Sequence, residues 1–334
     1  MKRLRVLVIG YGSIGKRHAA NLRALGVSEL AVCETETERR ILAEAQLGVR
    51  TFDQLARALS QRFDAVLVAT PPSSHVPIAI AAAEAGCHLF IEKPLSHTED
   101  QVDWLIALAR RRGLVTMIGC NMRFHPNLAF MKRFLSEGEL GKVYSISAEV
   151  GAYLPEWRPG IDYRENYGAQ QALGGGVLLD SIHEIDYVRW LLGEIAEVQC
   201  FAGRVSDLEI ETEDLALILV RFASGALGSL HLDYVQRPYC RGCKIIGERG
   251  VLVWDMTEGA VRFYDHRSAD WRVLHELAEN ADMNELYLDE LRAFLRAAET
   301  GVPVMPDIAE GASVLRWTLK CKELAGLIGV PAHG

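Results

Sequence analysis

The sequence predicts an α/β protein, with a doubly wound parallel sheet in a first domain and an α+β fold in a second. Strand-like and helix-like segments alternate as far as about residue 120, whereas strand-like segments follow one another closely from about residue 198. The 334 residues also exceed what one hydrophobic core usually supports. We therefore expect domains over residues 1–122 and 123–334, with the last helix packing back on the first domain.

Short, continuous apolar runs predict the strands of the first domain, because parallel strands are usually covered on both faces. These runs lie at residues 3–9, 29–33, 64–69, 87–91 and 114–119. Helical patterns separate them at residues 13–25, 36–46, 53–60, 76–85 and 98–112, with Asp53 as the expected N-cap of the third helix. Since crossovers between parallel strands are right-handed, the doubly wound Rossmann arrangement is the simplest topology.

The second domain is predicted to contain a mostly antiparallel sheet. Alternation and β-branched residues indicate strands at residues 143–150, 198–204, 214–222, 226–235, 243–246, 251–254 and 260–264. Few helices separate these segments, so neighbouring strands are expected to run antiparallel. Helical patterns lie at residues 126–137, 177–192, 283–299 and 307–327.

Composition and charge exclude several classes of protein. The net charge of −8 argues against nucleic-acid binding, which requires a basic surface. No apolar run approaches the roughly 20 residues that span a bilayer, so we expect a soluble protein without a membrane partner. The seven cysteines are scattered, which favours a reducing cytoplasm. Cys240 and Cys243 have the spacing of a metal pair, but a lone pair favours a strand over a metal centre.

A glycine motif lies where the first predicted strand meets the first predicted helix, and it reads Gly10-Tyr-Gly12-Ser13-Ile14-Gly15. Gly10 permits the tight turn, Gly12 lets the backbone approach a pyrophosphate, and Gly15 lets the helix pack closely on the strand. The N–H groups at the positive end of the helix then face the phosphates. The motif in this context predicts a dinucleotide site, which includes Ser13 and Ile14.

Glu34 ends the second predicted strand, 24 positions after Gly10. A carboxylate there accepts hydrogen bonds from both hydroxyls of the adenosine ribose and repels a 2′-phosphate. Thr35 and Glu36 follow, with no basic residue immediately available to pair with such a phosphate. We therefore expect NAD rather than NADP as the cofactor. The alternative is that Glu34 is only a solvated strand end.

Four segments together resemble the glucose–fructose oxidoreductase / inositol dehydrogenase family (Gfo/Idh/MocA). They are the glycine motif, Ala69-Thr-Pro-Pro-Ser-Ser-His75, Glu92-Lys93-Pro94, and Gly174-Gly-Gly176 through His183-Glu-Ile-Asp186. The resemblance implies that the second-domain sheet is open. It also implies a set of cofactor contacts after the strands, at Thr70, Pro71, Pro72, His75, Glu92, Lys93, Asn121 and Arg123. It further implies a cis bond before Pro94 and a substrate contact from Arg123, for which a surface charge is the alternative.

The resemblance also implies a catalytic pair, Lys93 and His183. Oxidation of an alcohol needs a group that takes the hydroxyl proton while hydride leaves the carbon, and the pKa of that group should lie near the working pH. A histidine meets this need almost unaided, and a lysine meets it when its pKa is lowered. We assign His183 as general acid/base and Lys93 as the group that holds and polarises the reacting oxygen, while the reverse assignment stays open.

Asp180 departs from the pattern of the family, whose members often carry an aspartate four residues before the histidine. Here Asp180 lies three residues before His183, and Leu179 occupies the fourth position back. Because both spacings share one face of a helix, Asp180 is expected to orient the imidazole or to touch the substrate.

A loop between a strand and the glycine-led helix is expected to bind substrate. It runs from Tyr153 to Arg164, and its predicted contacts are Tyr153, Trp157, Arg158, Asp162 and Tyr163. Aromatic rings stack on sugars, and arginines clamp anionic groups. The alternative is a loop that packs against a neighbouring subunit.

The resemblance implies an NAD-dependent oxidoreductase that transfers hydride between nicotinamide and a secondary hydroxyl or ketone of a sugar, sugar acid or nucleotide sugar. One alternative is a sugar enzyme that uses NAD without net redox chemistry, such as an epimerase, a dehydratase or a glycoside-cleaving enzyme. Another is a non-catalytic protein that senses NAD or a sugar. In this family the second-domain sheet commonly mediates oligomerisation, which implies a homodimer or homotetramer.

Overall fold

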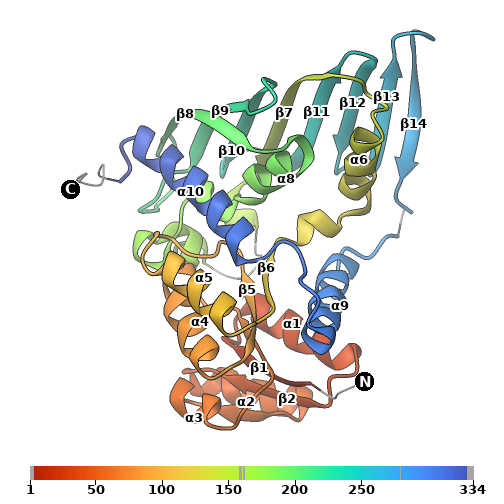
Figure 1. Cartoon of the computed structure of the whole chain (residues 1–334). Helices are drawn as coiled ribbons and strands as arrows, with labels where there is room; N and C mark the ends of the chain where they lie inside the picture. The colour runs from red at the N-terminus through yellow and green to blue at the C-terminus, as the bar shows by residue number, and fades with distance from the viewer. Residues whose placement is uncertain (1–3, 158–159, 161, 279, 329–334) are drawn as a thin grey trace. The chain divides into compact units, whose positions relative to one another are not determined.

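A computed structural model describes residues 4–157, 160, 162–278 and 280–328 (Figure 1). The chain divides into two compact units, one made of residues 1–121 and 283–315 and the other of residues 122–282 and 316–334. Each is described by itself. Within the described ranges, no helix combines the length and the apolar character needed to cross a membrane.

The first unit is built on a six-stranded parallel sheet with the order β3-β2-β1-β4-β5-β6. Its strands are β1 (Arg5–Ile9), β2 (Glu29–Cys33), β3 (Arg50–Phe52), β4 (Ala65–Val68), β5 (His88–Glu92) and β6 (Thr116–Gly119). The central strands are buried along almost their whole length, which is why their sequences are continuous apolar runs. The predicted doubly wound sheet is confirmed. The sequence did not predict its sixth strand, β3, because this strand is too short and too exposed to form an apolar run.

Helices cover this sheet with bounds close to those expected. They are α1 (Ser13–Ala24), α2 (Thr37–Leu47), α3 (Leu55–Leu59), α4 (His75–Glu84), α5 (Val102–Arg111), α9 (Glu285–Thr300) and the first part of α10 (Ile308–Leu324). The expected N-cap at Asp53 is wrong, because α3 begins at Leu55 and Gln54 is its N-cap. The expected start of α5 at residue 98 is also wrong, since Gln101 has a φ of 58° and cannot continue a right-handed helix.

The segment 283–315 belongs to the first unit, although the domain expected over residues 123–334 includes it. Figure 1 shows α9 beside α1, and Asn284 and Asn21 exchange amide hydrogen bonds of 2.9 and 3.2 Å. The rings of Phe294 and Phe90 lie 5.6 Å apart. The Ile118 N–H donates to the Pro306 carbonyl over 2.8 Å, so this late segment also covers β6.

The second unit is built on an eight-stranded sheet with the order β14-β13-β12-β11-β7-β10-β9-β8. Its strands are β7 (Val143–Gly151), β8 (Ile195–Gly203), β9 (Leu215–Phe222), β10 (Leu227–Asp233), β11 (Cys240–Gly247), β12 (Gly250–Asp255), β13 (Ala260–Asp265) and β14 (Asp270–Glu276). Neighbouring strands are antiparallel except β7 and β10, which confirms the mostly antiparallel sheet. The edge strand β14 is largely exposed and therefore lacks an apolar pattern.

Two helices replace the single helix expected over residues 177–192. They are α7 (Val177–Asp180) and α8 (His183–Leu192), and α6 (Pro126–Ser136) lies earlier in the unit. The break falls at Ser181, whose φ of −92° and ψ of 29° leave helical geometry. As a result, Asp180 and His183 lie on different helices, and the argument that they share one helix face is wrong.

Candidate active site

The glycine motif has the geometry that a dinucleotide needs. Gly10 has a φ of 90°, and a Cβ there would lie 2.7 Å from the Ala69 carbonyl oxygen. A Cβ on Gly15 would lie 2.0 Å from the Gly10 carbonyl oxygen, whereas one on Gly12 would meet nothing within 4 Å. Gly10 and Gly15 therefore let the loop pack tightly, and Gly12 leaves open space for a pyrophosphate. Ser13 and Ile14 begin α1, where free N–H groups favour an anion.

Glu34 is buried, with 7% of its surface exposed, so the alternative of a solvated strand end is wrong. Its Oε2 accepts a hydrogen bond from the Tyr11 N–H over 2.7 Å, and its Oε1 accepts one from the Glu36 N–H over 2.9 Å. The carboxylate thus ties the glycine loop to the end of β2.

Two arginines of α2 lie beside Glu34, which corrects the expectation that no basic residue is immediately available. Arg39 Nη1 lies 3.9 Å from Glu34 Oε2, and Arg40 Nη1 donates to the Glu34 carbonyl over 2.8 Å. Both side chains lie near Glu34 because α2 begins only three residues after it. Discrimination against a 2′-phosphate therefore depends on the Glu34 carboxylate itself.

We expect Glu34→Gln to weaken NAD binding about 10-fold or more and NADP binding much less, since a charged hydrogen-bond acceptor is lost while the arginines remain. Dissociation constants for both dinucleotides, from fluorescence titration, measure this difference. Glu38→Gln, in the first turn of α2, is a matched control. Equal losses for the two cofactors would contradict the assigned role of Glu34.

The loop after β4 is held to the segment after β5 by His75. His75 Nε2 lies 2.7 Å from the Thr70 carbonyl oxygen, and its Nδ1 lies 2.8 Å from that of Pro94. Burial lowers the pKa of His75, against the opposing effect of these two carbonyls. Pro71 and Pro72 fix the loop between β4 and α4. The ring of His75 therefore organises the predicted cofactor loop through backbone contacts.

Glu92 ends β5 and Lys93 follows it, at the same sheet edge as the glycine motif. The Lys93–Pro94 peptide bond is cis, as the resemblance implied. Glu92 is buried, and its Oε2 accepts a hydrogen bond from the Lys93 N–H over 3.1 Å. Lys93 is half-buried. Because carboxyl ends of parallel strands share one edge, the glycine motif, the Thr70 loop and Lys93 follow β1, β4 and β5 side by side.

Arg123 is not a surface charge, so that alternative is wrong. Only 9% of its surface is exposed, and its guanidinium forms a two-point ion pair with Asp186, with distances of 2.9 and 2.7 Å. A second such pair joins Arg241 to Glu184 over 2.7 and 2.9 Å. These two pairs anchor the first turn of α8, which carries His183, itself 8% exposed. Asn121 is also buried.

Asp180 lies in a cluster of hydroxyl groups that the sequence does not reveal. Tyr167 donates a short hydrogen bond to its Oδ1, and Tyr234 donates to its Oδ2 over 3.2 Å. Burial and the nearby Asp180 charge raise the pKa of Tyr234 well above its usual range. The Trp157 ring packs edge-on against Tyr234 at 5.3 Å, so the structure brings two predicted site residues, Trp157 and Asp180, together through Tyr234.

The glycine run explains how Tyr167 reaches Asp180. A Cβ on Gly175 would lie 2.2 Å from the Tyr167 carbonyl oxygen, and one on Gly176 would lie 2.3 Å from Glu213 Oε1. Glu213 in turn accepts the Leu178 N–H and pairs with Lys322 over 2.9 Å. Glycines are needed here because two loops pack directly against the start of α7.

The other predicted substrate contacts are spread along a series of short turns. Tyr153 lies under the Arg237 guanidinium, 3.1 Å from ring centroid to Cζ, and Asp162 accepts the Arg164 N–H over 3.0 Å. The Tyr163 hydroxyl accepts the Glu209 N–H over 3.2 Å. Arg158 lies outside the described residues. Among the described residues of this group, Trp157 is linked to Asp180 through Tyr234, and the contacts of the whole group with substrate stay predictions.

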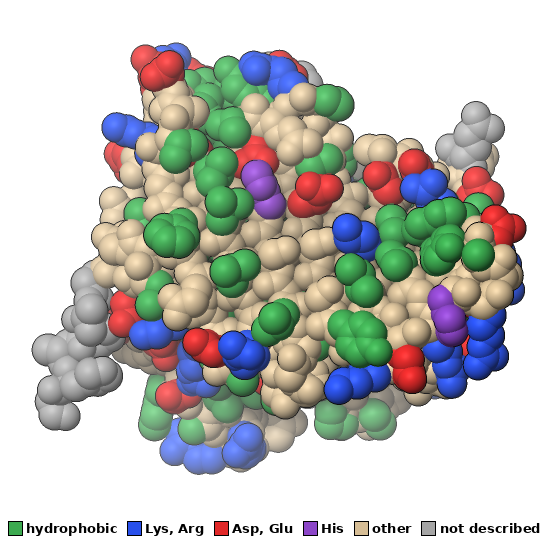
Figure 2. Space-filling view, turned by 90° about the horizontal axis from the view of Figure 1, so that it is seen from above, with side chains coloured by type: hydrophobic (Ala, Val, Ile, Leu, Met, Phe, Trp, Pro, Cys, Tyr) green, Lys and Arg blue, Asp and Glu red, His purple; other side chains and the backbone are tan. Residues whose placement is uncertain are grey.

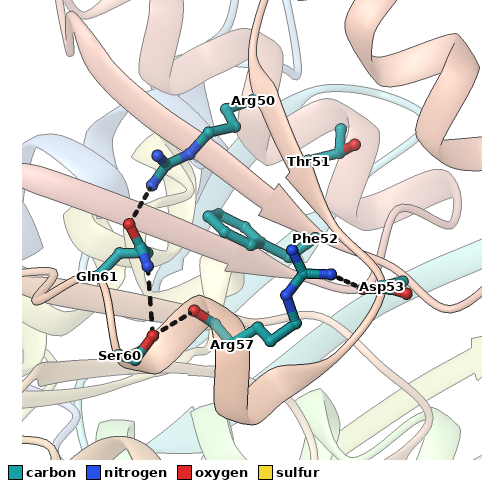
Figure 3. Close-up of a pocket in the computed structure, with 7 residues that line it drawn as sticks. All are labelled: Arg50, Thr51, Phe52, Asp53, Arg57, Ser60 and Gln61. Carbon is teal, nitrogen blue, oxygen red and sulfur yellow. Dashed lines mark hydrogen bonds and ion pairs between the residues drawn. The ribbon is translucent and has the colours of Figure 1, made fainter.

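A surface depression of about 370 Å³ lies elsewhere in the first unit, around β3 and α3 (Figure 3). Its lining residues are Arg50, Thr51, Phe52, Asp53, Arg57, Ser60 and Gln61. Figure 3 shows Arg50 turned toward Gln61 at 3.2 Å and Arg57 toward Asp53 at 3.4 Å. Arg50 and Arg57 are therefore bonded to neighbouring side chains of the depression, and no predicted site residue lines it.

Comparison with known proteins assigns both parts of the chain. Residues 4–120 match the family model described as "Oxidoreductase family, NAD-binding Rossmann fold", and residues 128–253 match "GFO/IDH/MocA C-terminal domain". The chain is 30% identical to myo-inositol 2-dehydrogenase of Thermotoga maritima over 90% of each chain. It is 29% identical to UDP-N-acetylglucosamine 3-dehydrogenase of Acidithiobacillus ferrooxidans, over 96% of this chain and 97% of the relative.

A solved structure supports the fold of the whole chain. Levoglucosan dehydrogenase in complex with NADH and levoglucosan is similar with a TM-score of 0.87 at 23% identity, covering 98% of this chain and 99% of the other. Both family models match in the expected order, and the inositol dehydrogenase relative spans nearly the full length. The chain belongs to the Gfo/Idh/MocA family of oxidoreductases.

Proposed function

We propose that this chain is an NAD-dependent dehydrogenase that acts on a secondary hydroxyl of a sugar, cyclitol, sugar acid or nucleotide sugar. The observation that carries the proposal is the shared edge of the first sheet, where the glycine motif, the Thr70 loop and Lys93 follow adjacent strands. The relatives named above support the substrate class, since they act on an inositol and a nucleotide sugar.

Bound NAD would supply the hydride acceptor at this sheet edge. Glu34 would hold the adenosine ribose, and the N–H groups at the start of α1 would hold the pyrophosphate. Lys93 would hold and polarise the reacting oxygen, and His183 would take its proton. The pH–rate profiles of His183→Asn and Lys93→Ala decide between this assignment and its reverse. Arg123 and Asn121 keep their proposed place beside the nicotinamide and the substrate.

A panel of sugars, cyclitols, sugar acids and nucleotide sugars, incubated with the full chain and NAD, tests this function. We expect a lasting rise in absorbance at the NADH wavelength with at least one of them. Product formation without net NADH would favour the alternative of a sugar enzyme that only recycles bound NAD. Absence of turnover with the whole panel in either direction would contradict the proposed substrate class.

We further propose that the outer face of the larger sheet pairs with a second copy of the chain. On β8 and β9 the exposed side chains include Phe201, 81% exposed, directly across from Leu217, and Leu219, 61% exposed. Leu227 and Ile246 extend this apolar face onto β10 and β11. Figure 2, which looks down on the larger sheet, shows hydrophobic side chains gathered in groups. Such patches usually mark an interface.

Leu219→Lys is therefore expected to convert a dimer or tetramer to smaller species, because a buried unpaired charge opposes assembly. Light scattering coupled to size-exclusion chromatography measures the mass of each variant. Glu38→Lys, on α2 of the first unit, is a control for added positive charge. A wild-type monomer, or an unchanged mass of the Leu219 variant, would refute this interface.

A further inference from the structure

A buried cluster of three titratable side chains lies in the first unit, and two of its members, His18 and Glu290, have no role in the function proposed above. His18 comes from α1, Glu92 from the end of β5 and Glu290 from α9. Their exposed fractions are 0%, 7% and 0%. One polar atom from each lies within 4.8 Å of the other two. The cluster therefore brings three titratable groups together in the interior, and one of them, Glu92, directly precedes Lys93 in the chain.

Glu92 connects this cluster to the backbone of Lys93. His18 Nε2 lies 2.5 Å from Glu92 Oε1, and the Lys93 N–H donates to Glu92 Oε2 over 3.1 Å. A Cβ on Gly119 would lie 2.9 Å from Glu92 Oε1, so a glycine at the end of β6 makes room for the carboxylate. One carboxylate thus accepts hydrogen bonds from helix α1 on one side and from the proposed catalytic segment on the other.

The carboxyl group of Glu290 lies in the cluster, and the question is whether it is ionised there. Neither of its carboxyl oxygens has a hydrogen-bond partner in the described part of the chain. Burial, and then the negative charge of Glu92, raise the pKa of Glu290 well above its usual range. His18 faces it from α1 and Glu92 from β5, while Tyr287 of α9 packs on the His18 ring at 5.9 Å. A proton on Glu290 removes the second buried negative charge.

A proton fits this geometry better than a metal ion. Two ligands of one tetrahedral zinc ion, each at about 2.1 Å from it, lie about 3.4 Å apart. The 2.5 Å separation of His18 Nε2 and Glu92 Oε1 is shorter than this, and it is also shorter than an ordinary N–H···O hydrogen bond, so it fits a short, charge-assisted hydrogen bond.

We propose that His18, Glu92 and Glu290 form one proton-sharing cluster that fixes the backbone at Lys93, which makes His18 and Glu290 positioning residues for the dehydrogenase reaction. His18 donates from Nε2 to the ionised Glu92, and Glu290 stays neutral beside them. The positioning part rests on the proposed function, whereas the protonation of Glu290 is independent of it.

The pH dependence of stability tests the proton on Glu290. A carboxyl group whose pKa rises on folding stabilises the fold at low pH, and this contribution is lost as the pH rises toward the raised pKa. Glu290→Gln is neutral at every pH, so we expect the Tm of the wild-type chain to fall relative to that of this variant as the pH rises above the ordinary carboxyl pKa of about 4.5 toward the raised pKa. Glu285→Gln, exposed on the same helix, is the control. A difference between wild type and Glu290→Gln that does not change with pH would overturn the proposal.

Kinetics test the positioning role. Glu290→Gln is expected to keep kcat near neutral pH and to lose any alkaline fall in kcat that comes from ionisation of Glu290. His18→Leu removes the donor to Glu92 and is expected to lower kcat about 10- to 100-fold, with little change in NAD affinity. His18→Gln, whose amide reaches the same position, is expected to recover most of the rate. An unchanged kcat in His18→Leu, or equal losses in both His18 variants, would overturn the role.

Two further outcomes separate the competing explanations. One equivalent of a divalent metal in the purified chain, with a fall in Tm on addition of EDTA, would place a cation where we propose a proton and would overturn the proposal. If no sugar is oxidised but the Tm difference still widens with pH, the proposed function fails while the proton on Glu290 stands. Failure of the inference and failure of the function are therefore distinguishable.

Discussion

Lys93→Ala is expected to lower kcat about 10²- to 10⁴-fold, which is the usual range for the loss of a positioned acid–base group. NAD affinity should remain nearly the same, because Lys93 is one of many contacts assigned to the dinucleotide, and those of the glycine loop and Glu34 remain. The hydrogen bond from Lys93 to Glu92 is donated by the backbone N–H, so a change of the side chain leaves it in place. Stopped-flow turnover and equilibrium titration with NAD give the two quantities.

Lys142→Ala is a matched control, since Lys142 is an exposed lysine at the start of the second unit's first strand. It should turn over at the wild-type rate. Unchanged turnover in Lys93→Ala would remove this lysine from the chemistry. A loss of NAD binding equal to the loss of turnover would instead make Lys93 a cofactor ligand.

His183→Asn is expected to cause a loss of similar size, about 10²- to 10⁴-fold in kcat, and to remove the acidic limb of the pH–rate profile. That limb reports the protonation of a general base, so its loss would identify His183 as that group. The buried ion pairs Arg123–Asp186 and Arg241–Glu184 hold α8 without the imidazole, so the helix should stay folded.

The same profile decides between the two assignments of the catalytic pair. If the acidic limb persists in His183→Asn and disappears in Lys93→Ala, the lysine is the base and the histidine holds the oxygen. His266→Asn, an exposed histidine in the second unit, should change neither rate nor profile. Wild-type rates in His183→Asn would contradict both assignments.

The cofactor half of the site could be predicted because its signals are local in sequence. A buried strand, a glycine turn and a helix start follow one another within residues 5–24, and Glu34 ends the adjacent strand. Gly10 and Gly15 are required there by backbone geometry, and the sequence shows them directly. The arginines beside Glu34 were not evident, because only the turn of α2 over the strand end brings Arg39 and Arg40 back to it.

The substrate half depends on contacts between distant segments. Tyr167 and Tyr234 meet Asp180 only after the glycine run packs against neighbouring loops. The break at Ser181 is equally invisible in a sequence whose apolar pattern continues through it. Glu290 did leave a signal, since it stands on the apolar face of α9 with Leu286, Leu291 and Phe294. A charged residue at such a position rarely stays buried without a purpose.

The late arrival of α9 in the first unit has a consequence for biosynthesis. Residues 1–121 emerge from the ribosome first, but Phe294 and Glu290, which complete their core, follow only after the whole second sheet has been made. A nascent chain that ends before residue 283 therefore exposes the β6 and α1 surfaces that this segment later covers. Chaperone binding and protease sensitivity should be greatest at that stage of translation and should disappear once the chain from residue 283 onward is released.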